Sequence, residues 1–593
     1  MSRTVSFIRI SICIVGGFIL VVSCDDDSIA PPAGSPQLPL YWTWQNPLPQ
    51  GHFLFDVWGT AHDNVYAVGD AGNIVHFDGS EWEVMKSGTR EDFEGIWGAA
   101  EDSIFAVGNT GMILHFDGVV WNTMNSGTGR HLWDVWGTSA TDVFAVGANG
   151  TILHYDGGGW STMNSNSTST LRAVWGNTPA DVYAVGDAGT ILHYDGVSWT
   201  SVFSDSKLVF RGVWASSSQD VFAVGNEGSN TAGIAKIYRL QGTSWELVYA
   251  NSSDRFLAVW GAGPDNVFAA DFDGGVTRFN GSNWQPMNTG VADELWGVWG
   301  SSVDDLFAVG SAGLILNYDG IDWRRMNRGE QSRLTDVWAA SSGILYAVGS
   351  QGTILRDAGG EWEKMASGTQ VTLNAIWGDA DDHLLAVGDA GVILRRMGAD
   401  WERMESGTTA NLRGVWGSSN SDVFAVGVGN TILRYDGTVW QAMDDVPESN
   451  LYSVWGISGN NVYAGGLFGV LLNYDGATWR RISTDTPHNL LGIWGSAPND
   501  VFVVGSGRTI LHFDGSSWAS QQSPVSEQLQ AAWGTDSRNV FAVGSGGVVL
   551  RFDGDRWRDL PGITSHSLSG LRTGSSDEVY VVGTAGTILR YGP

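Results

Sequence analysis

Tryptophan recurs at a fixed spacing through almost the whole chain. Successive positions are 39 residues apart, except that Trp214 and Trp260 are 46 apart. A fixed period of this length predicts a chain built from copies of one supersecondary unit. A fourteenth copy begins at Leu568, with Arg572 where the tryptophan is expected. The thirteen tryptophans of this series are Trp58, Trp97, Trp136, Trp175, Trp214, Trp260, Trp299, Trp338, Trp377, Trp416, Trp455, Trp494 and Trp533.

The copy from Leu412 to Trp440 predicts four strands and no helix. Short runs rich in apolar, β-branched and aromatic residues are separated by small polar residues, glycines and an Asp-Gly pair, which are turn-forming residues. None of its segments combines helical length with a 3.6-residue period. The predicted strands are 412–416, 423–426, 431–435 and one that starts near Trp440.

Fourteen units of four strands predict an all-β fold of the β-propeller class. A solenoid of stacked β-coils is the alternative. The last copy stops at Pro593 after three strands, while Tyr41–Asn46 matches the fourth-strand segment at Trp121–Asn125. We therefore expect the N-terminal segment to pair with the strand around Tyr591 and close a ring, which removes exposed sheet edges.

Fourteen blades exceed the four to eight that a propeller commonly has. The preferred interpretation is two seven-bladed rings, with blades 1–7 in residues 41–329 and blades 8–14 in residues 330–593. A single large ring is the alternative, because the 39-residue period crosses the midpoint without a linker. The only interruption, Asn226–Gln241, predicts a longer hairpin loop in the fifth copy.

The N-terminus predicts a targeting segment over residues 1–23. Arg3 and Arg9 precede an apolar run that is short for a membrane-spanning helix. The run ends in Val21-Val22-Ser23-Cys24, which resembles the lipobox of bacterial lipoprotein precursors and implies lipid attachment at Cys24. An ordinary secretory signal is the alternative. Residues 24–40 are acidic and then rich in proline, which predicts an extended tether.

The cysteine content and the net charge restrict the expected cellular location and binding partners of the protein. Cys13 and Cys24 are the only cysteines, so the chain without residues 1–23 can form no internal disulfide and no cysteine-based metal site. That chain has 30 basic and 63 acidic residues, a net charge of −33. Such a charge repels nucleic acid and anionic lipid headgroups. We expect a monomer in the bacterial cell envelope, outside the cytoplasm, that contacts the membrane only through its lipid.

The recurring polar residues are expected to have structural roles rather than catalytic or metal-binding ones. Acidic residues or asparagines such as Asp142 and Asn64 precede the second strand, where side-chain to backbone hydrogen bonds suit a turn. Histidines at one place in the third strand, such as His154, are spread around the repeats and cannot converge on one metal ion. The sequence has no zinc-protease or nucleophile-elbow motif. We therefore predict no catalytic residue, no cofactor and no metal, although a glycosidase could still assemble two acids from different blades.

The Asp-Gly-x-x-Trp segments at Asp156–Trp160, Asp195–Trp199 and Asp514–Trp518 resemble the Asp-box of the BNR-repeat propellers. That superfamily includes sialidases and Ycf48-like photosystem assembly factors. The Asp-box has Asp-x-Gly after serine, whereas Asp and Gly are adjacent here. The sialidase arginine triad cannot be placed on this sequence, so the resemblance implies the fold and not the activity.

One position differs between the copies where the others repeat. It lies three residues before each tryptophan of the series, near the start of the strand expected to be innermost. Aromatic and arginine side chains there suit recognition of peptides or sugars. The candidate ligand face consists of Phe55, Trp133, Arg172, Arg211, Trp296, Arg413 and Tyr452; drift at an exposed position is the alternative.

These observations favour a lipid-anchored binding or scaffolding module for a protein or a polysaccharide. A propeller enzyme that acts on carbohydrate is the alternative from another class. An assembly factor for a membrane complex, like the Ycf48 group, is the third interpretation.

Overall fold

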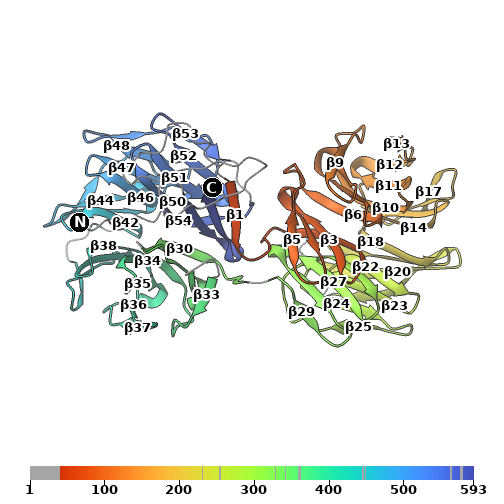
Figure 1. Cartoon of the computed structure of the whole chain (residues 1–593), viewed down its shortest axis with the longest axis horizontal. Coiled ribbons are helices and arrows are strands. Elements are labelled where there is room, and N and C mark those ends of the chain that lie inside the picture. The colour runs from red at the N-terminus through yellow and green to blue at the C-terminus, as the bar shows by residue number, and fades with distance from the viewer. Residues whose placement is uncertain are drawn as a thin grey trace, which may run out of the picture. The chain divides into compact units, whose positions relative to one another are not determined.

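A computed structural model describes residues 41–592, except for 230–231, 253–254, 328, 341, 358–361, 444–446, 448, 561–563 and 574–577. The expected signal segment, Cys24 and the tether lie outside the described residues. The described chain folds into fourteen antiparallel four-stranded sheets and no α-helix (Figure 1). The prediction of fourteen four-stranded propeller blades is therefore confirmed.

Seven consecutive sheets form the unit that we call the first ring. Its strands are β2 (Leu54–Ala61), β3 (Asn64–Gly69), β4 (Ile74–Phe77), β5 (Trp82–Met85); β6 (Phe93–Ala100), β7 (Ser103–Gly108), β8 (Ile113–Phe116), β9 (Trp121–Met124); β10 (Leu132–Ser139), β11 (Asp142–Gly147), β12 (Thr151–Tyr155), β13 (Trp160–Met163); β14 (Leu171–Thr178), β15 (Asp181–Gly186), β16 (Ile191–Tyr194), β17 (Trp199–Phe203); β18 (Leu208–Ser217), β19 (Asp220–Ser229), β20 (Ala232–Gln241), β21 (Ser244–Asn251); β22 (Phe256–Gly263), β23 (Asn266–Asp271), β24 (Val276–Phe279), β25 (Trp284–Met287); β26 (Leu295–Ser302), β27 (Asp305–Gly310), β28 (Ile315–Tyr318) and β29 (Trp323–Arg325).

The other seven sheets form the second ring. Its strands are β30 (Leu334–Ala339), β31 (Leu345–Gly349), β32 (Ile354–Asp357), β33 (Trp362–Met365); β34 (Leu373–Ala380), β35 (His383–Gly388), β36 (Ile393–Met397), β37 (Asp400–Met404); β38 (Leu412–Ser419), β39 (Asp422–Gly427), β40 (Ile432–Tyr435), β41 (Trp440–Ala442); β42 (Leu451–Ser458), β43 (Asn461–Gly466), β44 (Leu471–Tyr474), β45 (Trp479–Ile482); β46 (Leu490–Ala497), β47 (Asp500–Gly505), β48 (Ile510–Phe513), β49 (Trp518–Ser520); β50 (Leu529–Asp536), β51 (Asn539–Gly544), β52 (Val549–Phe552), β53 (Trp557–Leu560); β54 (Leu568–Thr573), β55 (Val579–Gly583), β56 (Ile588–Gly592) and β1 (Tyr41–Asn46).

The packing between sheets shows where each ring closes. In the first ring, β2 packs against β26, and Leu54 and Val57 share one apolar cluster with Phe307 of the seventh sheet. In the second ring, β30 packs against β54, and Leu334 shares a cluster with Val582 of the last sheet. The first strand of each sheet contacts the first strands of its neighbours, so these strands are the innermost of the ring.

The N-terminal strand β1 completes the last sheet of the second ring, as the sequence predicted. The sheet order is β1, β56, β55, β54, and β1 lies beside the C-terminal strands in Figure 1. The ring centroids of Trp42 and Tyr591 are 5.0 Å apart. The buried amide of Asn46 donates hydrogen bonds to the carbonyls of Gly586, at 2.6 Å, and Glu330, at 2.7 Å. Because β1 pairs with β56, β56 has no unpaired edge.

Eleven of the thirteen tryptophans of the 39-residue series pack on a glycine of the neighbouring sheet. The exceptions are Trp175, which donates to the carbonyl of Ala215, and Trp533, which contacts Arg572. A Cβ added to Gly98 would lie 2.6 Å from the Trp58 ring, and one added to Gly137 would lie 2.9 Å from the Trp97 ring. Because no side chain fits there, the glycine after the tryptophan allows two innermost strands to approach closely. In a Trp-Gly pair of the sequence, the tryptophan therefore packs on one neighbouring sheet and the glycine receives the tryptophan of the other.

The hairpins between second and third strands contain a short 3-10 turn in nine described sheets. A glycine ends each turn in the left-handed conformation, such as Gly72 at φ +76°. The turns are η1 (Asp70–Gly72), η2 (Asn109–Gly111), η3 (Ala148–Gly150), η4 (Ser311–Gly313), η5 (Ser350–Gly352), η6 (Asp389–Gly391), η7 (Leu467–Gly469), η8 (Ser545–Gly547) and η9 (Thr584–Gly586). In the fifth sheet the expected longer loop is instead an extension of the ladder, because β19 and β20 are ten residues each.

Candidate functional site

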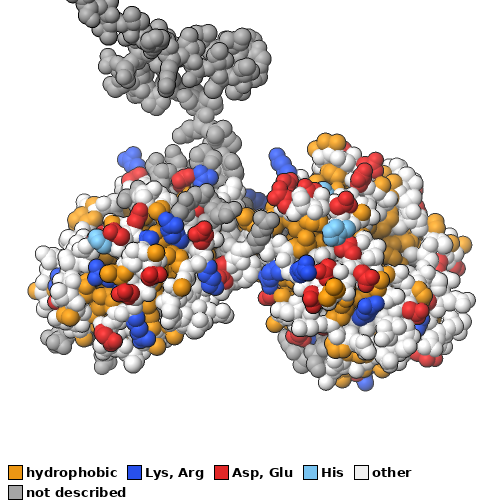
Figure 2. Space-filling view, turned by 60° about the horizontal axis from the view of Figure 1, so that its bottom comes forward, with side chains coloured by type: hydrophobic (Ala, Val, Ile, Leu, Met, Phe, Trp, Pro, Cys, Tyr) orange, Lys and Arg blue, Asp and Glu red, His pale blue; other side chains and the backbone are white. Residues whose placement is uncertain are grey.

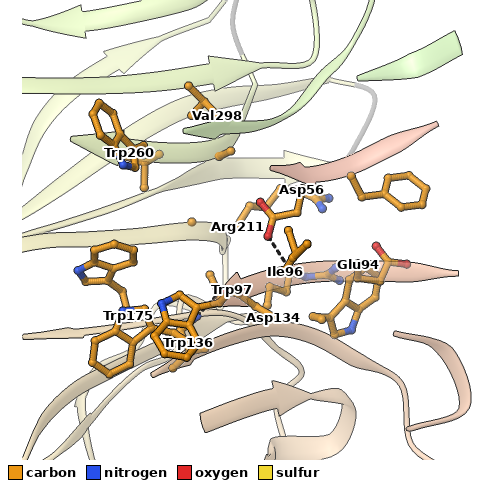
Figure 3. Close-up of a pocket in the computed structure, with 18 of the residues that line it drawn as sticks. Asp56, Glu94, Ile96, Trp97, Asp134, Trp136, Trp175, Arg211, Trp260 and Val298 are labelled. Carbon is orange, nitrogen blue, oxygen red and sulfur yellow. Dashed lines mark hydrogen bonds between the residues drawn. The ribbon is translucent and has the colours of Figure 1, made fainter. Parts of the chain in front are cut away.

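A cavity of about 160 Å³ lies at the centre of the first ring (Figure 3). The variable position contributes a lining residue from every one of the seven sheets. These residues are Phe55, Glu94, Trp133, Arg172, Arg211, Leu257 and Trp296. We call them the mouth residues of the first ring. The side chains at the position that varies between the copies therefore lie together around one cavity.

Tryptophans of the 39-residue series line the same cavity below the mouth residues. Trp136 and Trp175 lie toward one end of the view in Figure 3, and Glu94 lies toward the other. Apart from Leu257, which is buried, the mouth residues are half-buried and keep access to the cavity. The mouth is therefore polar and aromatic, whereas the depth of the cavity is lined by indole rings and β-branched side chains.

Arg172 is held rigidly at the mouth. Its Nε donates to Oδ1 of Asp187 at 2.6 Å, and its Nη2 donates to Oδ2 of the same carboxylate at 3.3 Å. Its guanidinium carbon lies 4.8 Å from the centre of the Trp133 ring, which also stacks on His131 at 4.1 Å. The fork to one carboxylate and the cation–π contact fix the plane of the guanidinium.

The remaining mouth residues pair with their neighbours. Phe55 and Trp296 meet edge to face with ring centroids 5.8 Å apart, which brings the first and seventh sheets together. The indole N–H of Trp296 donates to Oε2 of Glu294 at 2.9 Å. Glu94 Oε1 lies 3.3 Å from Nε2 of His131 in the next sheet. These contacts orient the aromatic and acidic side chains before any ligand enters.

Two aspartates that sequence reasoning missed also line this cavity, directly after Phe55 and Trp133. Asp56 accepts backbone hydrogen bonds from Val57 and, across the sheets, from Ile96, both at 2.9 Å (dashed line in Figure 3). Asp134 accepts them from Val135 and from Val174 of the next sheet, both at 2.7 Å. Each carboxylate therefore joins one innermost strand to the next.

Burial changes the acidity of both aspartates. Desolvation raises the pKa of Asp56 to about 7, against the lowering effect of its two backbone hydrogen bonds. Desolvation, followed by repulsion from Asp56, raises the pKa of Asp134 well above its ordinary value. The sequence carried a signal for them, since eleven of the fourteen copies have glycine, alanine or serine at this position and only Asp56, Asp134 and Asp336 are acidic.

Arg413 and Tyr452 occupy the same position in the second ring and do not line this cavity. In the second ring, side chains at the variable position form hydrogen bonds to neighbouring sheets. Thr335 donates to the carbonyl of Leu373 at 2.6 Å, and Asn374 donates to the carbonyl of Leu412 at 2.8 Å. Arg413 donates to Oδ1 of Asn374 at 3.1 Å. The structure thus divides the predicted ligand face into two separate sets.

The recurring acidic and basic residues of the second and third strands pair with each other across the ladder. His154 Nε2 lies 2.7 Å from Oδ1 of Asp142, and Arg434 Nε donates to Oδ1 of Asp422 at 2.8 Å. The sequence predicted hydrogen bonds between these side chains and the turn backbone, but Asp142 and Asp422 instead pair with the side chain twelve residues later. Within the described residues, no group of three His, Cys, Asp or Glu side chains is arranged to hold a metal ion.

The Asp-Gly pairs form the hairpins between third and fourth strands. Oδ1 of Asp78 accepts hydrogen bonds from the backbone N–H groups of Ser80, at 2.8 Å, and Glu81, at 2.9 Å, and Gly79 has φ +90°. These N–H donors lower the pKa of Asp78 to about 2. The motif that carries the Asp-box resemblance is therefore a turn at the outer edge of the sheets that contain it, away from the cavity.

The surface is acidic and mixed in character. On the face that Figure 2 shows, basic side chains are interspersed with acidic ones over the residues drawn in colour. No continuous basic patch is seen on that face of the described chain. A search of the described residues for a helix long and apolar enough to cross a membrane finds none.

No protein-family model and no curated protein matches this sequence. Among solved structures, the fold is similar to PorZ of Porphyromonas gingivalis, a bacterial surface component of the type-IX secretion system, with a TM-score of 0.62 and 12% identity over 93% of this chain and 86% of that one. It is also similar to YCF48 from Cyanidioschyzon merolae, with a TM-score of 0.39 and 18% identity over 45% and 97% of the two chains. The extracellular domain of the putative hybrid two-component system BT3049 from B. thetaiotaomicron matches with a TM-score of 0.37 and 10% identity over 92% and 82%. The likeness to PorZ extends over nearly the whole chain and supports the propeller fold.

Proposed function

We propose that this chain is an extracytoplasmic binding or scaffolding module that binds a protein or a polysaccharide at the mouth of the first ring. The observation that carries the proposal is the convergence of seven side chains on one cavity, from a repeat position that varies strongly between the copies. Aromatic and arginine side chains that are already oriented lose little freedom on binding.

The proposal places the chain at the bacterial envelope through a lipid on Cys24. The support is the sequence Val21-Val22-Ser23-Cys24 and the absence of any other cysteine from the chain that would remain after cleavage. Lipid attachment is tested by expressing the full chain and its Cys24→Ala variant in a bacterium fed a labelled fatty acid. Label should enter the first and not the second, and label in the variant would contradict the anchor.

The binding proposal is tested by crosslinking the chain in its native membrane and identifying what is captured. Trp296→Ala removes an aromatic mouth residue, and Tyr452→Ala is the matched control at the same repeat position of the second ring. Capture should be lost in Trp296→Ala and kept in Tyr452→Ala when both variants melt at the temperature of the parent chain. Capture that survives Trp296→Ala would place the ligand elsewhere.

A second candidate function is carbohydrate hydrolysis in the same cavity. The observation that favours it is the presence of Asp56 and Asp134 in one cavity, since a glycosidase uses a pair of carboxyl groups, one protonated and one ionised. Against it stand the backbone hydrogen bonds that already occupy both carboxylates. Turnover of a glycan substrate that Asp134→Asn abolishes would favour the enzyme over the binding module.

We also propose that the two rings are separate domains divided near residue 329. Each ring closes on itself through its own apolar clusters, which supports independent folding. Strand β1 must then be counted with the second domain, although it precedes the first in the chain.

A further inference from the structure

Two arginines stand side by side at the mouth of the first ring. Arg172 comes from β14 and Arg211 from β18, and these innermost strands pack against each other. Both side chains line the cavity. Because the two residues hold the same place in neighbouring sheets, their guanidinium groups face one region of the mouth.

The fixed position of Arg172 prepares it to bind an oxyanion. Asp187 engages Nε and Nη2, and Trp133 lies beneath the guanidinium plane. Within the described part of the chain, no hydrogen bond from Nη1 of Arg172 is found, so this group can donate to a ligand. A guanidinium with a fixed plane binds a planar carboxylate through parallel N–H donors.

Arg211 is in an environment that disfavours its positive charge. Burial and then the charge of Arg172 lower the pKa of Arg211, Asp187 opposes them, and the net pKa is about 10. A negative group placed between the two guanidiniums would offset both the burial and the repulsion. The pair thus favours an anionic ligand on grounds of geometry and charge together.

The other residues of the cavity restrict the anion. Glu94 lines the same space, so a doubly charged group such as phosphate would meet more repulsion there than a singly charged carboxylate. Around the ring, Arg211 is followed by Leu257, Trp296 and Phe55, which give the mouth an apolar side next to the arginines. The faces of Trp133 are occupied by His131 and Arg172, which leaves it unsuited to stack on a sugar ring.

We infer that the mouth of the first ring binds a carboxylate carried on an apolar group. Arg172 and Arg211 bind the carboxylate, and Leu257, Trp296 and Phe55 cover the apolar part. This inference rests on the proposed function and specifies the chemistry that the mouth recognises.

The test uses 3-phenylpropionate as the probe and the purified full chain, with binding measured by calorimetry. The neutral 3-phenylpropionamide has nearly the same shape and should bind at least about tenfold more weakly. Arg172→Gln and Arg211→Gln should each weaken the binding of the acid by about tenfold or more. Arg413→Gln, at the same repeat position of the second ring, is the matched control and should bind like the parent chain.

Three results would overturn the inference. They are the absence of binding at about 10 mM probe, equal binding of acid and amide, and preference for inorganic phosphate or glucuronate over 3-phenylpropionate. A melting curve for each variant separates loss of binding from loss of folding. If a captured native partner depends on Trp296 and not on Arg172 or Arg211, the proposed function stands and this inference fails.

Discussion

The indole of Trp299 lies over Gly59, so that a Cβ added to Gly59 would come within 2.9 Å of the ring. Trp299 belongs to the seventh sheet and Gly59 to the first, and this contact closes the first ring. The same packing of a tryptophan on a glycine joins the other neighbouring sheets of the first ring that supply both residues. The contact that closes the first ring is therefore of the same kind as the contacts between its other sheets.

Gly59→Ala should destabilise the first ring. The new methyl group would lie against Trp299 and also 2.8 Å from the carbonyl oxygen of Asn64 on β3, so β2 must shift from both. Overpacking of this kind costs about 1 to 3 kcal/mol of unfolding free energy. Gly263→Ala is the control, since nothing lies within 4 Å of its Cβ position on strand β22. Denaturant unfolding of both variants measures the difference, and equal stability would contradict the packing role of Gly59.

Arg572→Ala should destabilise the second ring. Arg572 replaces the tryptophan of the fourteenth copy, and its guanidinium carbon lies 3.7 Å from the centre of the Trp533 ring and 5.0 Å from that of Trp338. Burial lowers the pKa of Arg572, and the nearby carboxylate of Asp336 opposes that shift. The substitution removes two cation–π contacts, each worth about 0.5 to 2 kcal/mol.

Calorimetry on the Arg572→Ala variant also tests the two-domain proposal. If the rings are separate domains, one melting transition should move to lower temperature and the other should stay in place. The double variant Arg572→Ala with Asp336→Ala should recover part of the loss, because the uncompensated carboxylate is gone. A single transition that shifts as a whole would contradict independent folding of the rings.

Asn46→Ala should weaken the closure of the second ring by strand β1. The buried side chain loses its hydrogen bonds to the carbonyls of Gly586 and Glu330 and from the N–H of Glu330, at 2.9 Å. Unpaired buried polar groups cost about 1 to 3 kcal/mol each. Hydrogen exchange should show earlier opening of β56 in this variant, whereas β28 of the first ring should exchange as in the parent. Unchanged protection of β56 would contradict the closing role.

The contribution of Asp56 to stability should fall as the pH rises from about 4 to about 7. Its pKa is about 7 in the folded protein against an ordinary value of 3.8, so the folded state holds a proton that the unfolded state releases in this range. The stabilisation is complete below the unfolded pKa and is lost through the folded pKa.

Asp56→Ala should therefore reduce the difference between the melting temperatures at pH 5 and pH 8. Alanine is tolerated at this position in other copies, such as Ala173. Asp78 provides the contrast, because its lowered pKa contributes stability that is lost only as the pH falls below about 4 toward 2. An unchanged pH dependence in Asp56→Ala would show that the Asp56 carboxyl does not titrate in this range.

The candidate site could be predicted in part. The variable position was visible in the sequence because Trp133 and Trp296 stand where other copies have Thr335 or Ser569, and the structure brings seven of these residues to one cavity. The separation of Arg413 and Tyr452 from that set followed from the preferred two-ring interpretation, which the unbroken 39-residue period did not distinguish from a single ring. Asp56 and Asp134 were overlooked because their role depends on the N–H groups of Ile96 and Val174, forty residues away.

The sequence by itself determined the four-stranded unit, its fourteen copies and the pairing of β1 with the C-terminal strand. A period-2 pattern with turn residues at fixed offsets is local information, and a missing strand at one end matches a surplus strand at the other. Only the tertiary structure decided the number of rings, because the 39-residue period crosses the midpoint unchanged. That choice depends on whether Trp299 packs on Gly59 or on the eighth sheet, a contact between residues 240 positions apart that no local pattern specifies.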